Sequence, residues 1–337
     1  MSSFVFGRNN LALTVFVPYN CNNTCPFCTS RACYQRMRPS AEDVTYQIDR
    51  IFRDFHFPIR DVVFTGGEPM ADLPTLKRLV GMIPDALDVY INTTLLSNGV
   101  AEFADFVNGT RKIKGINVSR HSTSYDEDLS QLRGIAEDEA VRLLEKPVRI
   151  NCVLTEAEGN EKCGDVIDRW KPYAPNVNLC FRRDFRERLT ERDLHNPYDD
   201  TAVVLQSMIP YRSHSQCNVC DTLRFSDAED GGFVVSYHRG QRKSSIYYPE
   251  RDVLEINDLI IFPDGTFTYD WEDTSIKRQH ELETAYRALR LSDEQIRNLK
   301  PAFPAPFPRF SVPCGCCTDL SDNRHTCGGG GCGGRAC

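Results

Sequence analysis

Three closely spaced cysteines near the start of the chain carry its clearest chemical signal. Cys21, Cys25 and Cys28 have the spacing C-x3-C-x2-C and directly follow the apolar run 11–17. Thiolates are the usual ligands of iron–sulfur clusters, and three of them around a [4Fe–4S] cluster leave one iron open to a small molecule. The alternatives are a structural zinc site, with Cys33 as a candidate fourth ligand, and ordinary buried thiols.

A glycine pair marks a second candidate ligand contact. Gly66 and Gly67 follow the β-branched run 61–64 and precede Glu68 and Pro69. Two glycines let a ligand approach the backbone closely, and the proline stiffens the turn that fixes the carboxylate. The segment therefore predicts binding at the end of a strand, and its alternative is a plain turn.

Strand-like and helix-like stretches alternate up to residue 209, a pattern typical of βα units around a parallel sheet. Helical periodicity is clearest in 44–55, where Ser40 offers an N-cap, and in 73–83. Both candidate binding segments lie at the ends of predicted strands. The predicted strands are 11–17, 61–65, 88–92, 115–119, 148–154 and 176–181.

Together, the cysteine spacing and the GGEP segment 66–69 resemble the radical S-adenosylmethionine (SAM) superfamily, in which both occur in this order. The resemblance implies an α/β fold, a partial (βα)6 TIM-type barrel with its active site at the C-terminal ends of the strands. It also implies that the three cysteines hold a [4Fe–4S] cluster and that the GGEP segment binds the amino group of SAM's methionine moiety.

The resemblance implies further SAM contacts at the ends of later strands. Phe27 matches a frequent aromatic residue of the family near the adenine, and its alternative role is to cover the cluster. Ser119 fits the polar residue near the ribose hydroxyls, and Asn151 on the next predicted strand fits a family tendency. Arg182, followed by Arg183, is a candidate partner for SAM's carboxylate or for an acidic substrate. A structural role is the alternative for each of them.

The chain divides into four predicted parts. They are a barrel core (1–209), a small β-rich C-terminal extension (210–300), a proline-rich linker (301–313) and a Cys/Gly-rich tail (314–337). The extension differs from the core in its residue pattern, because its apolar runs are short and separated by turn residues. Its stretches 233–238, 244–248 and 254–261 are β-rich, and its further predicted elements are a hairpin of 259–262 with 266–271 and a short helix over 291–300.

Cysteines outside the first loop raise the question of a second metal centre. The candidates are Cys217, Cys220, Cys314, Cys316 and Cys317. Many proteins of the family that resemble this chain carry extra clusters in C-terminal extensions called SPASM and twitch domains, although the full SPASM spacing is absent. An auxiliary iron–sulfur cluster, a zinc site and free thiols are the open interpretations. For the tail, a metalloid site, a sulfur relay and a flexible end also remain open.

Composition narrows the class of protein and its surroundings. The formal net charge of −7 gives no general reason to expect nucleic-acid binding. The chain has no apolar run long enough to cross a membrane and no N-terminal pattern of a signal peptide. Clustered cysteines in a cytosolic protein favour metal binding or redox chemistry over disulfides, so we expect a cytoplasmic protein.

The expected function is therefore that of a radical SAM enzyme. Reductive cleavage of SAM would give a 5′-deoxyadenosyl radical that abstracts hydrogen from a peptide or small metabolite, with an electron donor such as flavodoxin or ferredoxin. The resemblance lies closest to the branch with molybdopterin-precursor, peptide-modifying and heme-pathway enzymes. Sulfur or metalloid transfer through the tail cysteines and a non-enzymatic metal-binding protein are the alternatives. No catalytic side chain stands out, although His121 and the later thiols are candidates for quenching a radical.

Overall fold

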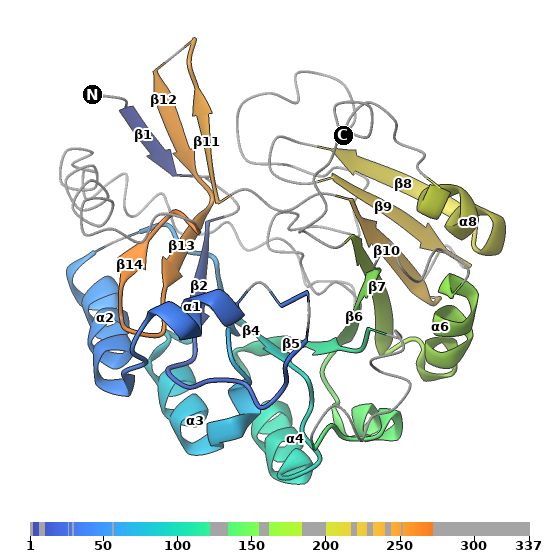
Figure 1. The fold of residues 1–337 in the computed structure, drawn as a ribbon, viewed down its shortest axis with the longest axis horizontal. Helices are drawn as coiled ribbons and strands as arrows, with labels where there is room; N and C mark the ends of the chain where they lie inside the picture. The colour runs from blue at the N-terminus through green and yellow to red at the C-terminus, as the bar shows by residue number, and fades with distance from the viewer. Residues whose placement is uncertain are drawn as a thin grey trace.

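Two β-sheets organise the protein (Figure 1). The computed structural model describes residues 3–6, 11–25, 27–28, 30–55, 57–121, 134–154, 162–183, 200–216, 221–227, 232–239, 244–250 and 252–271. The smaller sheet has the order β1 (Ser3–Phe6), β12 (Val253–Ile256) and β11 (Ser245–Tyr248). The larger sheet has the order β14 (Phe267–Thr268), β13 (Asp258–Ile261), β2 (Ala12–Phe16), β3 (Asp61–Thr65), β4 (Asp88–Thr93), β5 (Ile113–Ser119), β6 (Val148–Leu154), β7 (Val177–Arg183), β10 (Val234–His238), β9 (Asp221–Ser226) and β8 (Tyr211–Gln216).

The centre of the larger sheet is parallel, as the alternation of strands and helices predicts. Strands β2 to β7 pair in sequence order, all parallel. Strand β13 adds in parallel beside β2, and β10 adds in parallel beside β7. In the described chain the edge strands β14 and β8 do not pair with each other, so the barrel stays open. The predicted α/β class and partial barrel are confirmed.

Helices cover the outer side of this curved sheet (Figure 1). Ser40 caps α2 as predicted, because its Oγ accepts a hydrogen bond from the Asp43 N–H at 3.2 Å. The predicted apolar face of α2 is confirmed, since Val44, Ile48 and Ile51 are fully buried. None of the helices in the described residues is both long and apolar enough to span a membrane. The helices are α1 (Arg31–Arg36), α2 (Ala41–Asp54), α3 (Leu73–Met82), α4 (Val100–Gly109), α6 (Cys163–Trp170) and α8 (Asp200–Met208).

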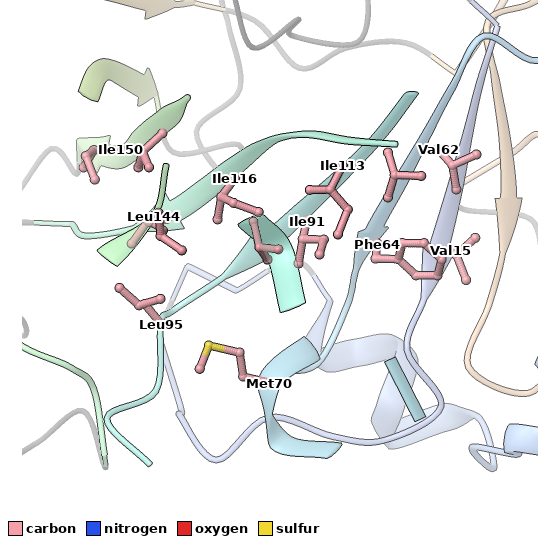
Figure 2. Packing of buried hydrophobic residues seen from close by; sticks show 14 of the residues in the cluster. Val15, Val62, Phe64, Met70, Ile91, Leu95, Ile113, Ile116, Leu144 and Ile150 are labelled. Atoms are coloured by element: carbon pink, nitrogen blue, oxygen red, sulfur yellow. The ribbon is translucent and has the colours of Figure 1, made fainter. Parts of the chain in front are cut away.

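Alternation along the strands separates an apolar outer face from a polar inner face. The outer side chains form one continuous core with the helices, and Figure 2 shows part of it. That part includes Val15, Val62, Phe64, Ile91, Ile116 and Ile150. The inner face instead carries hydrogen-bonding side chains. The Asn92 amide donates to Thr65 Oγ1 at 3.1 Å, and the Asn117 amide donates to Asn92 Oδ1 at 2.6 Å. The sheet therefore presents polar groups to the interior of the open barrel.

The β-rich part after residue 209 agrees with its prediction in one respect and differs from it in another. The predicted β-rich stretch 254–261 is confirmed, and it forms two strands, because the chain changes sheets at Asn257 and forms β12 in one sheet and β13 in the other. The N–H groups of Asn257 and Asp258 both donate to the Ser244 carbonyl, at 2.7 and 3.1 Å, which fixes the break. Strands β8 and β9 were not predicted, and with β10 they extend the core sheet instead of forming a separate one.

Several predicted features lie outside the described residues. They are the helix 291–300, the linker 301–313, the tail 314–337 and the candidate ligands Cys217, Cys220, Cys314, Cys316 and Cys317.

Candidate active site

The cysteine loop and the GGEP segment lie against each other at the ends of adjacent parallel strands, β2 and β3. The Val17 N–H donates to the Thr65 carbonyl at 2.9 Å, which continues the pairing beyond the strands. The Tyr34 hydroxyl then donates to the Val17 carbonyl at 2.8 Å and accepts from the Gly67 N–H at 2.6 Å. One side chain of α1 thus bridges the two segments.

A second tyrosine makes the same connection from the loop side. The Tyr19 hydroxyl lies 2.7 Å from the Pro69 carbonyl and 3.1 Å from the Asp72 carbonyl. Burial, followed by the charges of Asp72 and Glu68, raises the pKa of Tyr19 above its ordinary value, so the hydroxyl keeps its proton and donates. The segment that leads into the cysteines is therefore fixed to the turn after β3.

The structure gives a packing reason for the glycine pair. A Cβ on Gly67 would lie 2.1 Å from the Tyr19 carbonyl oxygen, and one on Gly66 would lie 2.2 Å from the Tyr34 hydroxyl. Gly66 also has a positive φ of 106°, which disfavours other residues. The space that the missing side chains leave is filled by the base of the cysteine loop and by Tyr34. Both glycines therefore allow the close approach of these protein segments.

We expect Tyr34→Phe to weaken the junction between the two segments. The change leaves the buried Val17 carbonyl and the Gly67 N–H without their partner, which costs about 1–3 kcal/mol of folding free energy. Tyr46→Phe is the matched control, because Tyr46 is 61% exposed. Urea unfolding followed by circular dichroism measures both. Equal stability of the two variants would contradict the bridging role.

The three cysteines occupy a partly exposed loop with donors suited to thiolates. Cys21 and Cys25 are half-buried and Cys28 is exposed. The Asn23 N–H donates to the Cys21 sulfur at 3.3 Å, and both polar atoms of the Asn23 amide are buried without a partner in the described chain. Burial raises the pKa of the Cys21 thiol, whereas the Asn23 N–H lowers it. Within the described residues no three metal-binding side chains are arranged around one point.

The donor set of this loop nevertheless fits an iron–sulfur cluster. Three thiols without disulfide partners, a backbone N–H directed at one sulfur and an unsatisfied amide are features that a bound cluster would use. Cys33, the candidate fourth ligand of a zinc site, is 7% exposed and packs in an apolar cluster. Its partners there include Phe16, Tyr34 and Phe262.

Glu68 is buried and its carboxylate is fully used by the protein. Oε1 accepts from the Met70 N–H at 2.9 Å and from Thr93 Oγ1 at 2.5 Å. Oε2 accepts from the N–H and the hydroxyl of Thr94, at 2.7 and 2.6 Å. Because four hydrogen bonds occupy the lone pairs of a carboxylate, this side chain connects the ends of β3 and β4. Glu68 therefore stabilises the strand ends beside the cysteine loop, a role that the sequence pattern did not indicate.

Arg120 is a second support that sequence reasoning missed. It is fully buried and follows β5 directly. Its Nε donates to Asp138 at 3.2 Å, one terminal nitrogen donates to the Thr94 carbonyl, and the other donates to the Ala136 carbonyl at 2.7 Å. The backbone N–H of Arg120 donates to the Asn151 carbonyl at 3.0 Å. An arginine after a strand resembles a solvent-exposed residue in the sequence, so no local pattern reveals this role.

The ring of Phe27 in the cysteine loop contacts the ring of His121, which follows β5. Their ring centroids lie 4.4 Å apart in an edge-to-face contact, and Phe27 is 8% exposed. His121 Nδ1 accepts from the Val153 N–H at 3.2 Å, which requires a neutral ring with its proton on Nε2. Burial, and then the Arg120 charge, lowers the pKa of His121 to about 3. Phe27 therefore packs on a neutral imidazole at the end of β5.

We expect this histidine to make stability depend on pH below its ordinary pKa of 6.5. As the pH falls from 6.5, the unfolded chain binds a proton that the folded chain does not, so the folded state loses stability. Because His121 is only half-buried, we expect a loss of about 1 kcal/mol between pH 7 and pH 5 that is absent in His121→Gln. Urea midpoints of both proteins at the two pH values test this. Identical losses would show that His121 titrates normally.

The other predicted contacts lie on the polar inner face, away from the cysteine loop in sheet order. Ser119 is paired in register with Asn151, and both are half-buried. Asn151 Oδ1 and Arg182 Nε are buried without a partner in the described part of the chain. Unsatisfied buried groups of this kind are typical of positions that await a ligand or water. The structure thus brings Ser119 and Asn151 together on neighbouring strands, with Arg182 one strand further on β7.

Comparisons with known proteins bear on this site. Residues 15–152, which include the cysteine loop, the GGEP segment and β5, match the family model described as the radical SAM superfamily. A search of curated proteins found no match.

The solved structures that are similar to this chain include two with bound peptides. SuiB from Streptococcus suis bound to the precursor peptide SuiA is 17% identical over 52% of this chain and 40% of that chain, with a TM-score of 0.38. Native anSMEcpe with bound AdoMet and Cp18Cys peptide is 16% identical over 54% of each chain, with a TM-score of 0.39. The matched region thus spans about half the length of these proteins or less.

Proposed function

Since residues 15–152 of this chain form a radical SAM domain, we propose that the protein is an enzyme that cleaves SAM reductively at a [4Fe–4S] cluster held by Cys21, Cys25 and Cys28. The observation that carries the proposal is the junction of the cysteine loop with the GGEP segment. Tyr34 connects the two segments by hydrogen bonds of 2.8 and 2.6 Å at the ends of adjacent parallel strands.

When bound, the cluster and SAM would supply the electron and the carbon radical that begin the reaction. The residues of the chain would hold and orient these groups. Tyr19 and Tyr34 fix the loop, and Glu68 fixes the turn after β3. Gly66 and Gly67 let the loop approach this turn, so SAM would contact the segment through its backbone rather than through the Glu68 carboxylate.

The remaining SAM contacts would come from Phe27 and from the polar inner face of β5 to β7. We propose that Phe27 with His121 lies beside the adenine and that Ser119 and Asn151 bind the ribose hydroxyls. The edge-to-face contact of 4.4 Å and the unpartnered Asn151 Oδ1 support these positions. Arg182 remains a candidate partner for a carboxylate of SAM or of the substrate.

Iron and sulfide counting after anaerobic reconstitution tests the cluster. We expect Cys21→Ala, Cys25→Ala and Cys28→Ala together to remove about four irons per chain and all SAM cleavage by dithionite-reduced protein. The matched control is Cys163→Ala, which alters a buried thiol on α6. Unchanged iron in the triple variant would overturn the proposal, and zinc in place of iron would favour the structural alternative.

A chain that ends at Pro313 tests the second metal centre. Loss of further iron on truncation would make the tail part of an auxiliary cluster, whereas unchanged iron with lost product formation would support sulfur or metalloid chemistry there. We propose a peptide or small metabolite as substrate, because the inner face offers amides and a guanidinium for polar contacts. We expect an electron donor of the flavodoxin or ferredoxin class.

A further inference from the structure

A cysteine and a histidine lie next to each other on the inner face of the sheet, outside the radical SAM domain. Cys180 on β7 is paired in register with Asn151 on β6 and with Ser236 on β10. His238 is two residues beyond Ser236, so both side chains leave the same face of neighbouring strands. Cys180 is fully buried and His238 is 7% exposed.

Contacts on both sides fix this pair. The Cys180 thiol donates to the Phe181 carbonyl at 3.8 Å, and the His238 imidazole lies near enough to act on the sulfur. On its other side, His238 Nδ1 lies 3.4 Å from Thr222 Oγ1 on β9, with which it is paired in register. The ring is therefore held between a hydroxyl and a sulfur, an arrangement that orients an imidazole to accept a proton from a thiol.

Two arginine side chains lie near the Cys180 sulfur, one on the neighbouring strand β6 and one on β7 itself. Arg149 comes from β6 and Arg182 from β7, and both lie close enough to act on Cys180 by their charge. Burial alone would raise the pKa of the Cys180 thiol, but His238, Arg182 and Arg149 bring it well below its ordinary value. Cys163 on α6 shows the contrast, because burial without charged neighbours raises its pKa to about 12.

The surroundings also contain groups without partners. Arg182 Nε and Asn151 Oδ1, which flank Cys180 along and across the strands, are buried and unpartnered in the described residues. Both side chains are half-buried, so the layer just beyond Cys180 reaches solvent at the C-terminal ends of the strands. A guanidinium N–H at this place suits a small molecule that carries a carboxylate.

We propose that Cys180 and His238 form a nucleophilic thiol–imidazole pair, and that Arg182 and Arg149 make it selective for small electrophiles that carry a carboxylate. The Cys180 sulfur would form a bond to an activated carbon, and the group that leaves this carbon would take the electron pair of its bond. The thiol proton goes to His238. No oxidant, reductant or metal is needed.

Alkylation of the full, reduced chain tests the pair with two probes of nearly equal size. Iodoacetate carries the charge that the arginines would attract, and iodoacetamide does not. Peptide mass spectrometry gives the rate at each cysteine. At pH 7 we expect Cys180 to react at least about tenfold faster than Cys163. We also expect its ratio of iodoacetate to iodoacetamide rates to exceed the ratio in urea-unfolded protein by at least about threefold.

Two variants separate the roles of the neighbours. His238→Gln should slow the reaction of Cys180 at pH 7 by about tenfold or more, because one pKa unit changes the thiolate fraction tenfold. Arg182→Gln should slow the reaction with iodoacetate more than the reaction with iodoacetamide, and so lower the ratio of the two rates, because the guanidinium attracts the carboxylate of the probe. If either variant misfolds, the rate of wild-type Cys180 from pH 5 to pH 9 still gives its pKa.

Three results would overturn the proposal. The first is no modification of Cys180 by either probe, and the second is a pH profile of an ordinary thiol. The third is a ratio of iodoacetate to iodoacetamide rates that is no higher in the folded than in the unfolded chain. Neither SAM nor a cluster takes part in the experiment, and Cys180 lies outside residues 15–152. The result is therefore independent of the iron measurements.

Discussion

Replacing Glu68 by alanine is expected to destabilise the protein by about 4 kcal/mol, because two buried and two partly buried donors lose their acceptor. The donors are the N–H groups of Met70 and Thr94 and the hydroxyls of Thr93 and Thr94. Glu68 is 1% exposed, so water does not replace the carboxylate easily. Guanidinium unfolding followed by circular dichroism measures the loss.

A conservative variant of Glu68 and a surface control test whether the lost hydrogen bonds cause this destabilisation. Glu68→Gln keeps the shape and one oxygen, so we expect about half of the effect. Glu102→Ala removes a carboxylate that is 65% exposed and pairs with Lys77 at 2.6 Å, and we expect less than about 0.5 kcal/mol. A small effect of Glu68→Ala would mean that the carboxylate is free for a ligand, as the family resemblance alone suggests.

Much of the fold follows from local sequence pattern. The six central strands could be predicted because β-branched runs alternate with helical periodicity, and α2 has both an N-cap at Ser40 and a clear apolar face. The location of the site follows as well, because parallel strands place the cysteine loop and the GGEP segment at the same edge. These features depend on residues that are neighbours in the chain.

The features that could not be predicted depend on distant partners. Gly67 is required by the Tyr19–Asn20 backbone, and no pattern near Gly67 indicates that contact. Arg120 is buried because the carbonyls of Thr94 and Ala136 converge on it from two loops. The pairing of β10 with β7 crosses a long connection, so the β-rich segment reads as a separate part of the sequence.

Replacing Gly67 by alanine should displace the cysteine loop. The new Cβ would lie 2.1 Å from the Tyr19 carbonyl oxygen and 2.8 Å from the Asn20 carbonyl carbon, both of which belong to the backbone. Since a backbone cannot rotate away as a side chain can, the loop that leads into Cys21 must move. We expect a loss of about 2–3 kcal/mol in stability.

Gly81→Ala is the matched control, because nothing lies within 4 Å of its Cβ in α3. There we expect a gain of about 0.5–1 kcal/mol from helix propensity. Iron content after reconstitution then separates two explanations for Gly67. If the glycine only permits packing, Gly67→Ala should lose iron together with stability, because the cysteines are displaced. If it only permits SAM to approach, the variant should keep both its stability and its iron and lose SAM binding alone, which would contradict the packing that the structure shows.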